Sequence, residues 1–421
     1  MSPRLHRLPN GVSIVCDPMP GLESTALSVV IRGGARWETE ETNGWSHLLE
    51  HMVFKGAGGR SARDIVEAIE SEGGHINAAT GYERTSFQVR CLKDGLPLAL
   101  GVLADLVRRP ALDQDELERE RGVIGQEIAE AADTPDDRVF DLAQSRAFDG
   151  HSLGRPILGT VESIGRARRE TLADFHQGLY ASDRTVISVA GAVDGEALLK
   201  LAEAQFGDAT APSDPLTPPA AAGFRGGEAI EARRLEQAHL VMLLPGIGAR
   251  YPDYFTARLF AEALGGGMAS RLFQEAREVR GLAYAIDAYH EAFDDTGLFG
   301  VYAGTNAADA AETARLTAEQ IHDLSSNVTA AELARSKALL KAHLFMARES
   351  PLARAEQNAG QLFLFGRLLK PTELAEGIDA VTSADFARFG ARLLASGQSV
   401  VAVLGPKGAG RATEAFRRAA A

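Results

Sequence analysis

The chain has 421 residues, of which 45% are hydrophobic and 24% are charged, and its formal net charge is −13. This composition is that of an ordinary globular protein, and the length suggests two to four domains. The acidic balance argues against a nucleic-acid partner, which would require a basic face on the protein.

The cysteine content and the apolar runs indicate where the protein works. Two cysteines, Cys16 and Cys91, are too few for a disulfide framework, so we expect a reducing compartment. Residues 1–15 lack the apolar core of a secretory signal, and no run of about 18 apolar residues is present. We therefore expect a cytoplasmic protein without a membrane span.

Two halves of the chain repeat the same order of elements. The first half has a strand-like run at residues 25–32, a Gly-Ala-Arg triplet at 34–36 and a long charged helix at 112–130. The sequence TLADF follows at 171–175, and a β-rich run at 186–191. Residues 208–228 are rich in Pro, Ala and Gly and predict a linker. The second half repeats the order, with TSADF in place of TLADF, at residues 238–244, 248–250, 328–344, 382–386 and 400–405.

This repetition predicts an α+β fold that arose by internal duplication. We expect two homologous domains, each with a mixed or antiparallel sheet and flanking helices, that face each other like a clamshell. The expected boundaries are 1–207 for the first domain, 208–228 for the linker and 229–421 for the second domain.

Residues 47–51 read His-Leu-Leu-Glu-His and carry the strongest functional signal. On a helix, His47 and His51 project from one face, and Glu50 lies on the same side. This H-x-x-E-H order is the inverted zinc-peptidase motif. A histidine pair on a half-buried helix can also be structural, so a third metal ligand is needed to support a catalytic site.

Candidate third ligands lie in a strongly helical run from Leu117 to Glu130. Glu127 lies 76 residues after His51, and Glu120 lies two helical turns before Glu127 on the same face. The run also contains Glu116, Glu118 and Glu130, and spacing alone does not choose among these carboxylates.

Residues 44–56 (GWSHLLEHMVFKG) and 118–128 (ERERGVIGQEI) resemble the family of pitrilysin and the mitochondrial processing peptidases, in particular a bacterial processing-peptidase-like member. The resemblance implies one Zn²⁺ per chain, held by His47, His51 and Glu127. It also implies that Glu50 is the general base and that Glu120 supports the site. When aligned with the second half, the motif meets no histidine, so that domain is a degenerate repeat that binds substrate.

The resemblance also suggests how substrate is held. Residues 264–284 (LGGGMASRLFQEAREVRGLAY) are similar to the segment that contacts substrate from the second domain, with Arg277 and Tyr284 as its polar groups. These two residues would bind the substrate backbone or help to hold the oxyanion. Asn77 and Ala78 match an Asn-Ala pair beside the sheet edge on which family members lay an extended peptide.

The sequence therefore predicts a zinc-dependent endopeptidase that acts on peptides or on unfolded, presequence-like segments. We expect a homodimer, with a related second subunit as the other possibility, because the processing peptidases divide these features between two chains. The alternatives are an inactive structural or assembly subunit of the same family, a metal-binding protein with no turnover, or an enzyme that acts on a non-peptide amide. Retention of all three ligands and of Glu50 favours the peptidase.

Overall fold

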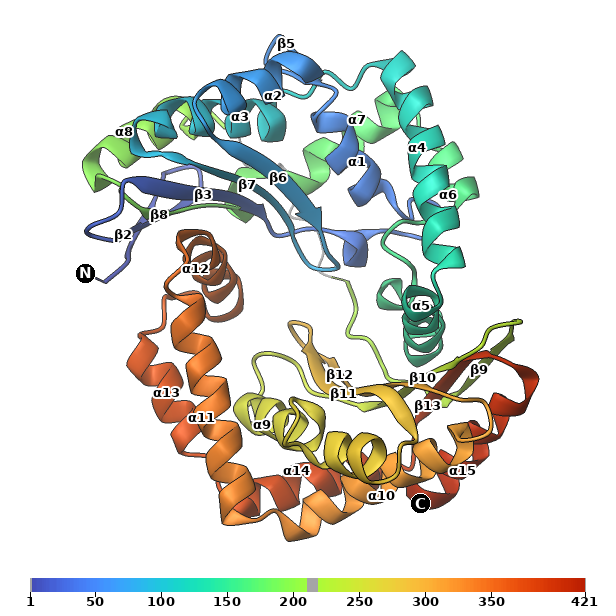
Figure 1. Cartoon of the computed structure of the whole chain (residues 1–421). Coiled ribbons are helices and arrows are strands. Elements are labelled where there is room, and N and C mark those ends of the chain that lie inside the picture. The colour runs from blue at the N-terminus through green and yellow to red at the C-terminus, as the bar shows by residue number, and fades with distance from the viewer. Residues whose placement is uncertain (1, 210–218, 421) are drawn as a thin grey trace. The chain divides into compact units, whose positions relative to one another are not determined.

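The computed structural model describes residues 2–209 and 219–420, and it divides the chain into two units of discontinuous segments (Figure 1). The first unit comprises Met1–Ile128, Pro156–Pro219 and Phe345–Lys370. The second comprises Ala129–Arg155, Ala220–Leu344 and Pro371–Ala421. Two of the boundaries between these segments fall within long helices, α4 (Gln114–Asp133) and α11 (Ala330–Ala347).

The first unit is built on a six-stranded sheet. Its strands are β1 (Arg4–Arg7), β2 (Ser13–Pro18), β3 (Ser24–Ile31), β6 (His75–Thr80), β7 (Thr85–Leu92) and β8 (Thr185–Gly191). They are ordered β1-β2-β8-β3-β7-β6, and all neighbours are antiparallel except β2 and β8. Two short strands, β4 (Gly56–Ala57) and β5 (Arg60–Ser61), form a separate hairpin.

Helices cover both faces of this sheet. The helices of the unit, besides most of α4, are α1 (Trp45–Val53), α2 (Ala62–Ser71), α3 (Leu96–Arg108), α6 (Val161–Gly165), α7 (Arg169–Leu179), α8 (Gly195–Phe206) and α12 (Pro351–Phe365). Figure 1 shows α12 on the face opposite to α2, α3 and α8. Strand β3 alternates accordingly, because Leu27 and Val29 belong to the main core whereas Val30 packs with Leu362 of α12.

The second unit repeats this plan with five strands. They are β9 (Gly227–Ala232), β10 (Ala238–Pro245), β11 (Ala283–Ala292), β12 (Gly297–Thr305) and β13 (Val400–Gly405), in the order β11-β12-β10-β13-β9. Its helices, besides most of α11, are α5 (Pro135–Ala147), α9 (Tyr254–Gly265), α10 (Ala310–Asn327), α13 (Pro371–Asp379), α14 (Ser383–Ala395) and α15 (Ala412–Ala420). In Figure 1, α5 lies on the sheet face opposite to α9, α10, α14 and α15.

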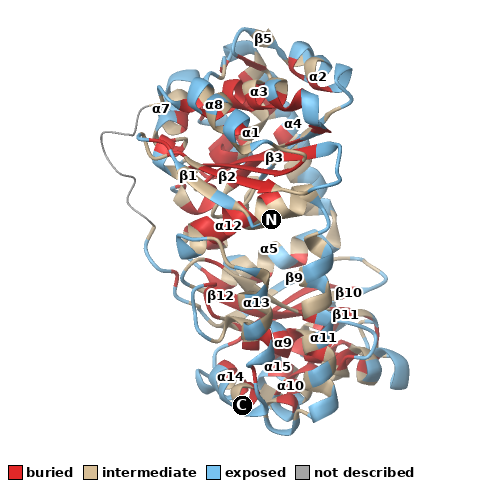
Figure 2. Cartoon of the chain, turned by 90° about the vertical axis from the view of Figure 1, so that its left-hand side faces the viewer, coloured by how far each residue is buried: buried red, intermediate tan, exposed pale blue. Residues whose placement is uncertain are grey.

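The two sheets have the same topology. Read from β6 in one unit and from β11 in the other, the strands follow the same order, and one parallel pair, β8–β2 or β13–β9, comes at the same place. Figure 2 shows that buried residues gather along the strands of both sheets. The predicted duplicated α+β fold is confirmed.

The division of the chain differs from the continuous ranges expected from the sequence. Segment 129–155 was expected in the first domain and packs in the second unit, whereas segment 345–370 packs in the first unit. Side chains account for the exchange, since Phe140 of α5 stacks on Tyr302 at 5.5 Å between ring centroids. Of the expected linker 208–228, residues 210–218 lie outside the described residues, and β9 already begins at Gly227.

Helix α12 has clear start and stop signals. Ser350 caps its N-terminus by accepting a hydrogen bond from the backbone N–H of Ala353, and Pro351 occupies the first turn. Gly366 ends it in the left-handed conformation with φ of 66°.

Among the described residues, no helix is long and apolar enough to cross a membrane.

A buried ion pair attaches α12 to the sheet. Asp17 of β2 is fully buried and accepts two hydrogen bonds from Arg354, from Nε at 2.8 Å and from a terminal nitrogen at 2.5 Å. Asn358 donates a third hydrogen bond to the same carboxylate at 3.0 Å. Because a buried carboxylate is costly without such partners, Arg354 is essential to this packing.

We expect Arg354→Leu to lower the free energy of unfolding by about 3 kcal/mol, because the Asp17 carboxylate stays buried without its cation. Urea denaturation followed by circular dichroism measures the change. Arg63→Leu is the matched control, since the ion pair between Arg63 and Glu67 is exposed, and it should leave the stability nearly unchanged. Equal losses in both variants would contradict this role of Arg354.

Candidate metal centre

Helix α1 carries the His-Leu-Leu-Glu-His residues at the edge of the hydrophobic core of the first unit. Four of its apolar side chains are fully buried, namely Leu48, Leu49, Met52 and Val53. His47, Glu50 and His51 are half-buried on the remaining side of the helix. The apolar face thus fixes the helix in the core and turns the two imidazoles and the carboxylate toward α4.

The structure brings His47, His51 and Glu127 together. Oε2 of Glu127 lies 3.8 Å from Nε2 of His47 and 3.7 Å from Nε2 of His51. One ligand atom from each of the three residues lies within 4.8 Å of the others, and the described residues contain no other such group of three metal-ligating side chains. Ligand atoms around tetrahedral zinc are about 3.3 Å apart, so this set of two nitrogens and one oxygen fits the ion.

Glu120 contacts the other ring nitrogen of His51. It is buried, with 3% of its surface exposed, and its Oε2 lies 2.9 Å from Nδ1 of His51. Because a carboxylate accepts, Nδ1–H of His51 donates this bond and Nε2 keeps the lone pair that a metal needs. Lys55 lies 2.7 Å from the other Glu120 oxygen and compensates its charge.

Burial prepares His47 and Glu50 for different roles. Burial, followed by the nearby charge of His51, lowers the pKa of His47 to about 4, so its ring is neutral at neutral pH. Burial raises the pKa of Glu50, while a hydrogen bond from Thr80 opposes the shift. The hydroxyl of Thr80 donates to Oε2 of Glu50 at 2.5 Å. A carboxyl group with a raised pKa holds a proton more readily than an ordinary glutamate does.

The expected substrate edge is the strand β6, which pairs with β7 alone among the strands of the described residues. Asn77 is exposed on this strand, and Ala78 is half-buried against the core. His75 begins this strand. Thr80 joins the edge to the metal centre through Glu50, so the strand and the site are neighbours.

Arg277 and Tyr284 lie in the second unit, and they contact each other. Arg277 sits on a π-helix, Phe273–Val279, and Tyr284 lies near the start of β11. The guanidinium carbon of Arg277 is 4.7 Å from the ring centroid of Phe273 and 5.4 Å from that of Tyr284. Tyr284 is 74% exposed, which leaves its ring and hydroxyl free to meet a ligand.

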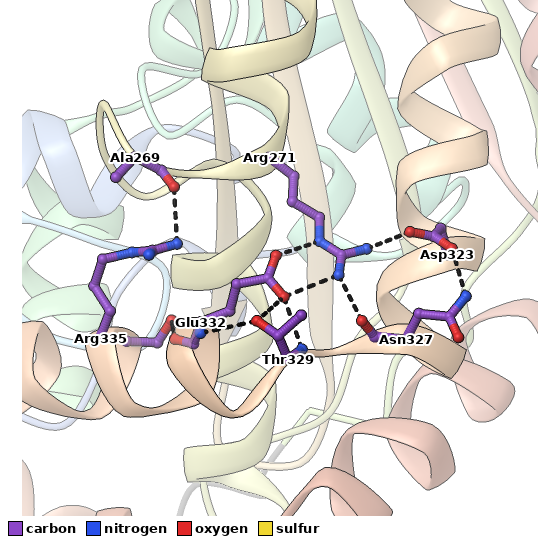
Figure 3. A network of polar contacts seen from close by, with 8 residues as sticks. Ala269, Arg271, Asp323, Asn327, Thr329, Glu332 and Arg335 are labelled. Atoms are coloured by element: carbon purple, nitrogen blue, oxygen red, sulfur yellow. Dashed lines mark hydrogen bonds and ion pairs between the residues drawn. The ribbon is translucent and has the colours of Figure 1, made fainter.

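A polar network fixes the segment before this π-helix (Figure 3). Arg271, whose side chain is 12% exposed, donates from Nε to Glu332 at 2.6 Å and from a terminal nitrogen to Asp323 at 2.7 Å. Arg335 donates to the backbone oxygen of Ala269 at 2.9 Å. Helices α10 and α11 thereby hold Arg271 and residues 265–270, which we call the glycine-rich loop. This loop precedes the π-helix that carries Arg277.

Sequence reasoning missed two side chains of the centre. Lys55 was detectable, because it lies one helical turn after His51 and hence on the same side of the chain. Thr80 had no comparable signal, since its contact with Glu50 depends on how β6 lies beside α1.

The comparisons with known proteins agree over nearly the whole chain. Residues 15–161 match the family described as Insulinase (Peptidase family M16), and residues 166–340 match the domain described as the Peptidase M16 inactive domain. An uncharacterized zinc protease of Rickettsia bellii is 35% identical over 406 residues, covering 96% of this chain and 97% of the relative. The uncharacterized zinc protease YmxG of Bacillus subtilis is 36% identical, covering 88% and 91%.

Solved structures share the fold. A protease from Helicobacter pylori superposes with a TM-score of 0.89 at 21% identity, covering 96% of this chain and 99% of that chain. A chain of complex III from Candida albicans superposes with a TM-score of 0.84 at 21% identity, covering 98% and 99%. Both the sequence relatives and the family match extend well beyond the histidine motif. The chain therefore belongs to the M16 peptidase family.

Proposed function

We propose that this chain is a zinc-dependent endopeptidase that cleaves peptides, or unfolded and presequence-like segments, in an extended conformation. The observation that carries the proposal is the convergence of His47, His51 and Glu127 with Glu50 beside them on α1. The relatives named zinc proteases support the choice of metal.

His47, His51 and Glu127 would hold one zinc ion. When bound, zinc would polarise the scissile carbonyl and lower the pKa of a water molecule to about 7. Glu50 accepts a proton from the attacking water at its carboxylate oxygen and then delivers that proton to the leaving amine nitrogen. Glu120 keeps His51 in the tautomer that leaves Nε2 unprotonated, with Lys55 balancing its charge.

The substrate backbone would extend the sheet at β6. The outer edge of β6 offers backbone N–H and C=O groups, which bind an extended peptide regardless of most of its side chains. Asn77 would add a side-chain contact, and Ala78 would leave room for the peptide. This mode explains a preference for unfolded segments, because a folded protein has no free strand to add.

Arg277 and Tyr284 of the second unit would also bind the substrate. Arg277 remains 41% exposed between its two aromatic neighbours, so its outer N–H groups can donate to a peptide carbonyl or to the oxyanion. Since one chain carries these residues as well as the ligand set, we propose that it works without a distinct partner subunit.

An inactive assembly subunit is the second candidate, and the structural likeness to a chain of complex III favours it. The complete ligand set and the half-buried Glu50 count against it, because a subunit without activity has no use for a base beside a metal site.

Glu50→Gln keeps the size of the side chain and removes the base. We expect kcat for a quenched fluorescent peptide to fall about a hundred- to ten-thousand-fold, with zinc content unchanged. The purified chain alone is assayed, and Glu67→Gln, an exposed change on α2, should retain full activity. Full activity of Glu50→Gln would rule out the role given to Glu50, and an inactive wild-type chain that holds zinc would support the assembly subunit.

Glu127→Ala removes a metal ligand rather than a base. Zinc affinity, measured by competition with a chromogenic chelator, should weaken by more than about a hundredfold, which exceeds the loss typical of supporting residues. Glu130→Ala alters an exposed carboxylate on the same helix and should bind zinc as the wild type does. Unchanged affinity of Glu127→Ala would remove this residue from the ligand set.

Arg277→Ala should impair substrate use while the metal stays in place. We expect kcat/KM to fall about tenfold to a hundredfold, the value of a hydrogen bond from a charged donor, with normal zinc content. Arg280→Ala is the matched control, because Arg280 lies at the end of the same helical segment and pairs with Glu312. Equal kinetics in the two variants would return Arg277 to a packing role.

A further inference from the structure

The helix that carries the metal-binding histidines cannot cap its own N-terminus. Helix α1 begins at Trp45, and its N-cap position is Gly44, with φ of 85° and no side chain to accept a hydrogen bond. Backbone N–H groups in the first turn of a helix have no partner within the helix and require an acceptor.

Two constraints keep a capping side chain out of position 44. The left-handed conformation favours glycine over residues with a Cβ atom. In addition, a Cβ atom there would lie 2.6 Å from the carbonyl oxygen of Leu158 and 2.7 Å from Cα of Gly159. Ser, Thr, Asp or Asn, the usual capping residues, are therefore excluded at this site.

Glu38 supplies the missing acceptor from outside the helix. Its Oε2 accepts from the backbone N–H of Gly44 at 2.7 Å, and its Oε1 accepts from the backbone N–H of Ser46 at 2.7 Å. Asn43 donates to the same carboxylate at 3.3 Å and to the backbone oxygen of Pro156 at 2.9 Å. One carboxylate thus bridges the residue before the helix and the second residue within it.

The burial of Glu38 indicates a specific task. Its residue surface is 4% exposed, and burial raises the pKa of its carboxyl group to about 7, against the opposing effect of the two backbone hydrogen bonds. Burial of a carboxyl group costs free energy, so a buried one is uncommon unless the groups that hydrogen-bond to it require it. Glu40, two residues along the same loop, is exposed.

The capped turn contains a metal ligand. His47 is the third residue of α1, directly after Ser46, so the position of its imidazole depends on the geometry of this turn. His51 is held through Nδ1 by Glu120, whereas Nδ1 of His47 is buried with no hydrogen-bond partner among the described residues. The position of the His47 ring therefore depends more on the backbone of the first turn than the position of the His51 ring does.

We propose that Glu38 is a positioning residue of the metal centre, which sets the first turn of α1 so that His47 meets His51 and Glu127. This inference rests on the proposed function, because it assigns a role toward the same metal. It adds a residue outside the ligand set, which acts through the backbone N–H groups of Gly44 and Ser46.

The test uses the full chain with Glu38→Gln, which keeps the size of the side chain but places an amide against the backbone N–H groups. We expect zinc affinity, measured by chelator competition, to weaken about tenfold or more, as for other residues that orient metal ligands. The visible absorption spectrum of the cobalt-substituted protein should also change, because it reports ligand geometry. Glu40→Gln removes the same charge from the same loop and should match the wild type in both measurements.

Thermal unfolding of the metal-free protein separates positioning from folding. If Glu38→Gln melts earlier but binds zinc and cobalt as the wild type does, Glu38 is only a structural cap and the inference is overturned. If Glu38→Gln fails to fold, Glu38→Asp takes its place, since it keeps the charge on a shorter arm; weakened zinc affinity then supports positioning, and wild-type affinity overturns it. A wild-type chain that binds no zinc would instead contradict the proposed function.

Discussion

The meeting of α1 and α4 is the constraint on which the site depends. His47 and His51 are one helical turn apart, and Glu120 and Glu127 are two turns apart on the facing helix. Both spacings are fixed within rigid helices, so only the relative placement of the helices decides whether the four side chains converge. A slip of one residue moves a helix by about 1.5 Å along its axis, which exceeds the tolerance of a metal site of about 0.5 Å. The buried apolar face of α1 prevents such a slip.

The two units share one plan but differ in the side chains at corresponding positions. Helix α9 follows β10 in the second unit as α1 follows β3 in the first, and the sheets share their strand order. At the positions aligned with the histidine motif, α9 carries Arg258, Ala261 and Glu262. These residues do not form a zinc set, whereas the glycine-rich loop after α9 is held by the Arg271 network. The strand order is thus shared by the two units, whereas the metal-ligating residue types occur in the first.

Much of the fold and of the site could be predicted from the sequence, and the reason is local. The histidine spacing, the helical run that contains Glu127 and the paired TLADF and TSADF segments are short-range patterns, which periodicity and turn signals report well. The family resemblance then chose Glu127 from several carboxylates that spacing left equivalent. Geometry places Glu127 beside the two histidines, with Glu120 on His51.

What the sequence did not reveal depends on contacts between distant segments. The exchange of α5 and α12 between the units follows from pairs such as Asp17 with Arg354, which no local pattern predicts. Thr80 reaches Glu50 only because β6 lies beside α1, and Glu38 reaches Ser46 only because its loop folds back on the helix. In each case the decisive partner is a backbone group or a side chain whose position is set by tertiary packing.

The exchange of α12 has a consequence for how the protein is made. The sheet of the first unit carries an apolar face, formed by Val15, Val30 and Val186, that α12 covers with Ala359 and Leu362. The ribosome completes all six strands by residue 191 but reaches the end of this cover only at residue 365. While residues 192–365 are being translated, the nascent chain therefore holds a sheet whose apolar face is still uncovered, a state that favours aggregation and chaperone binding.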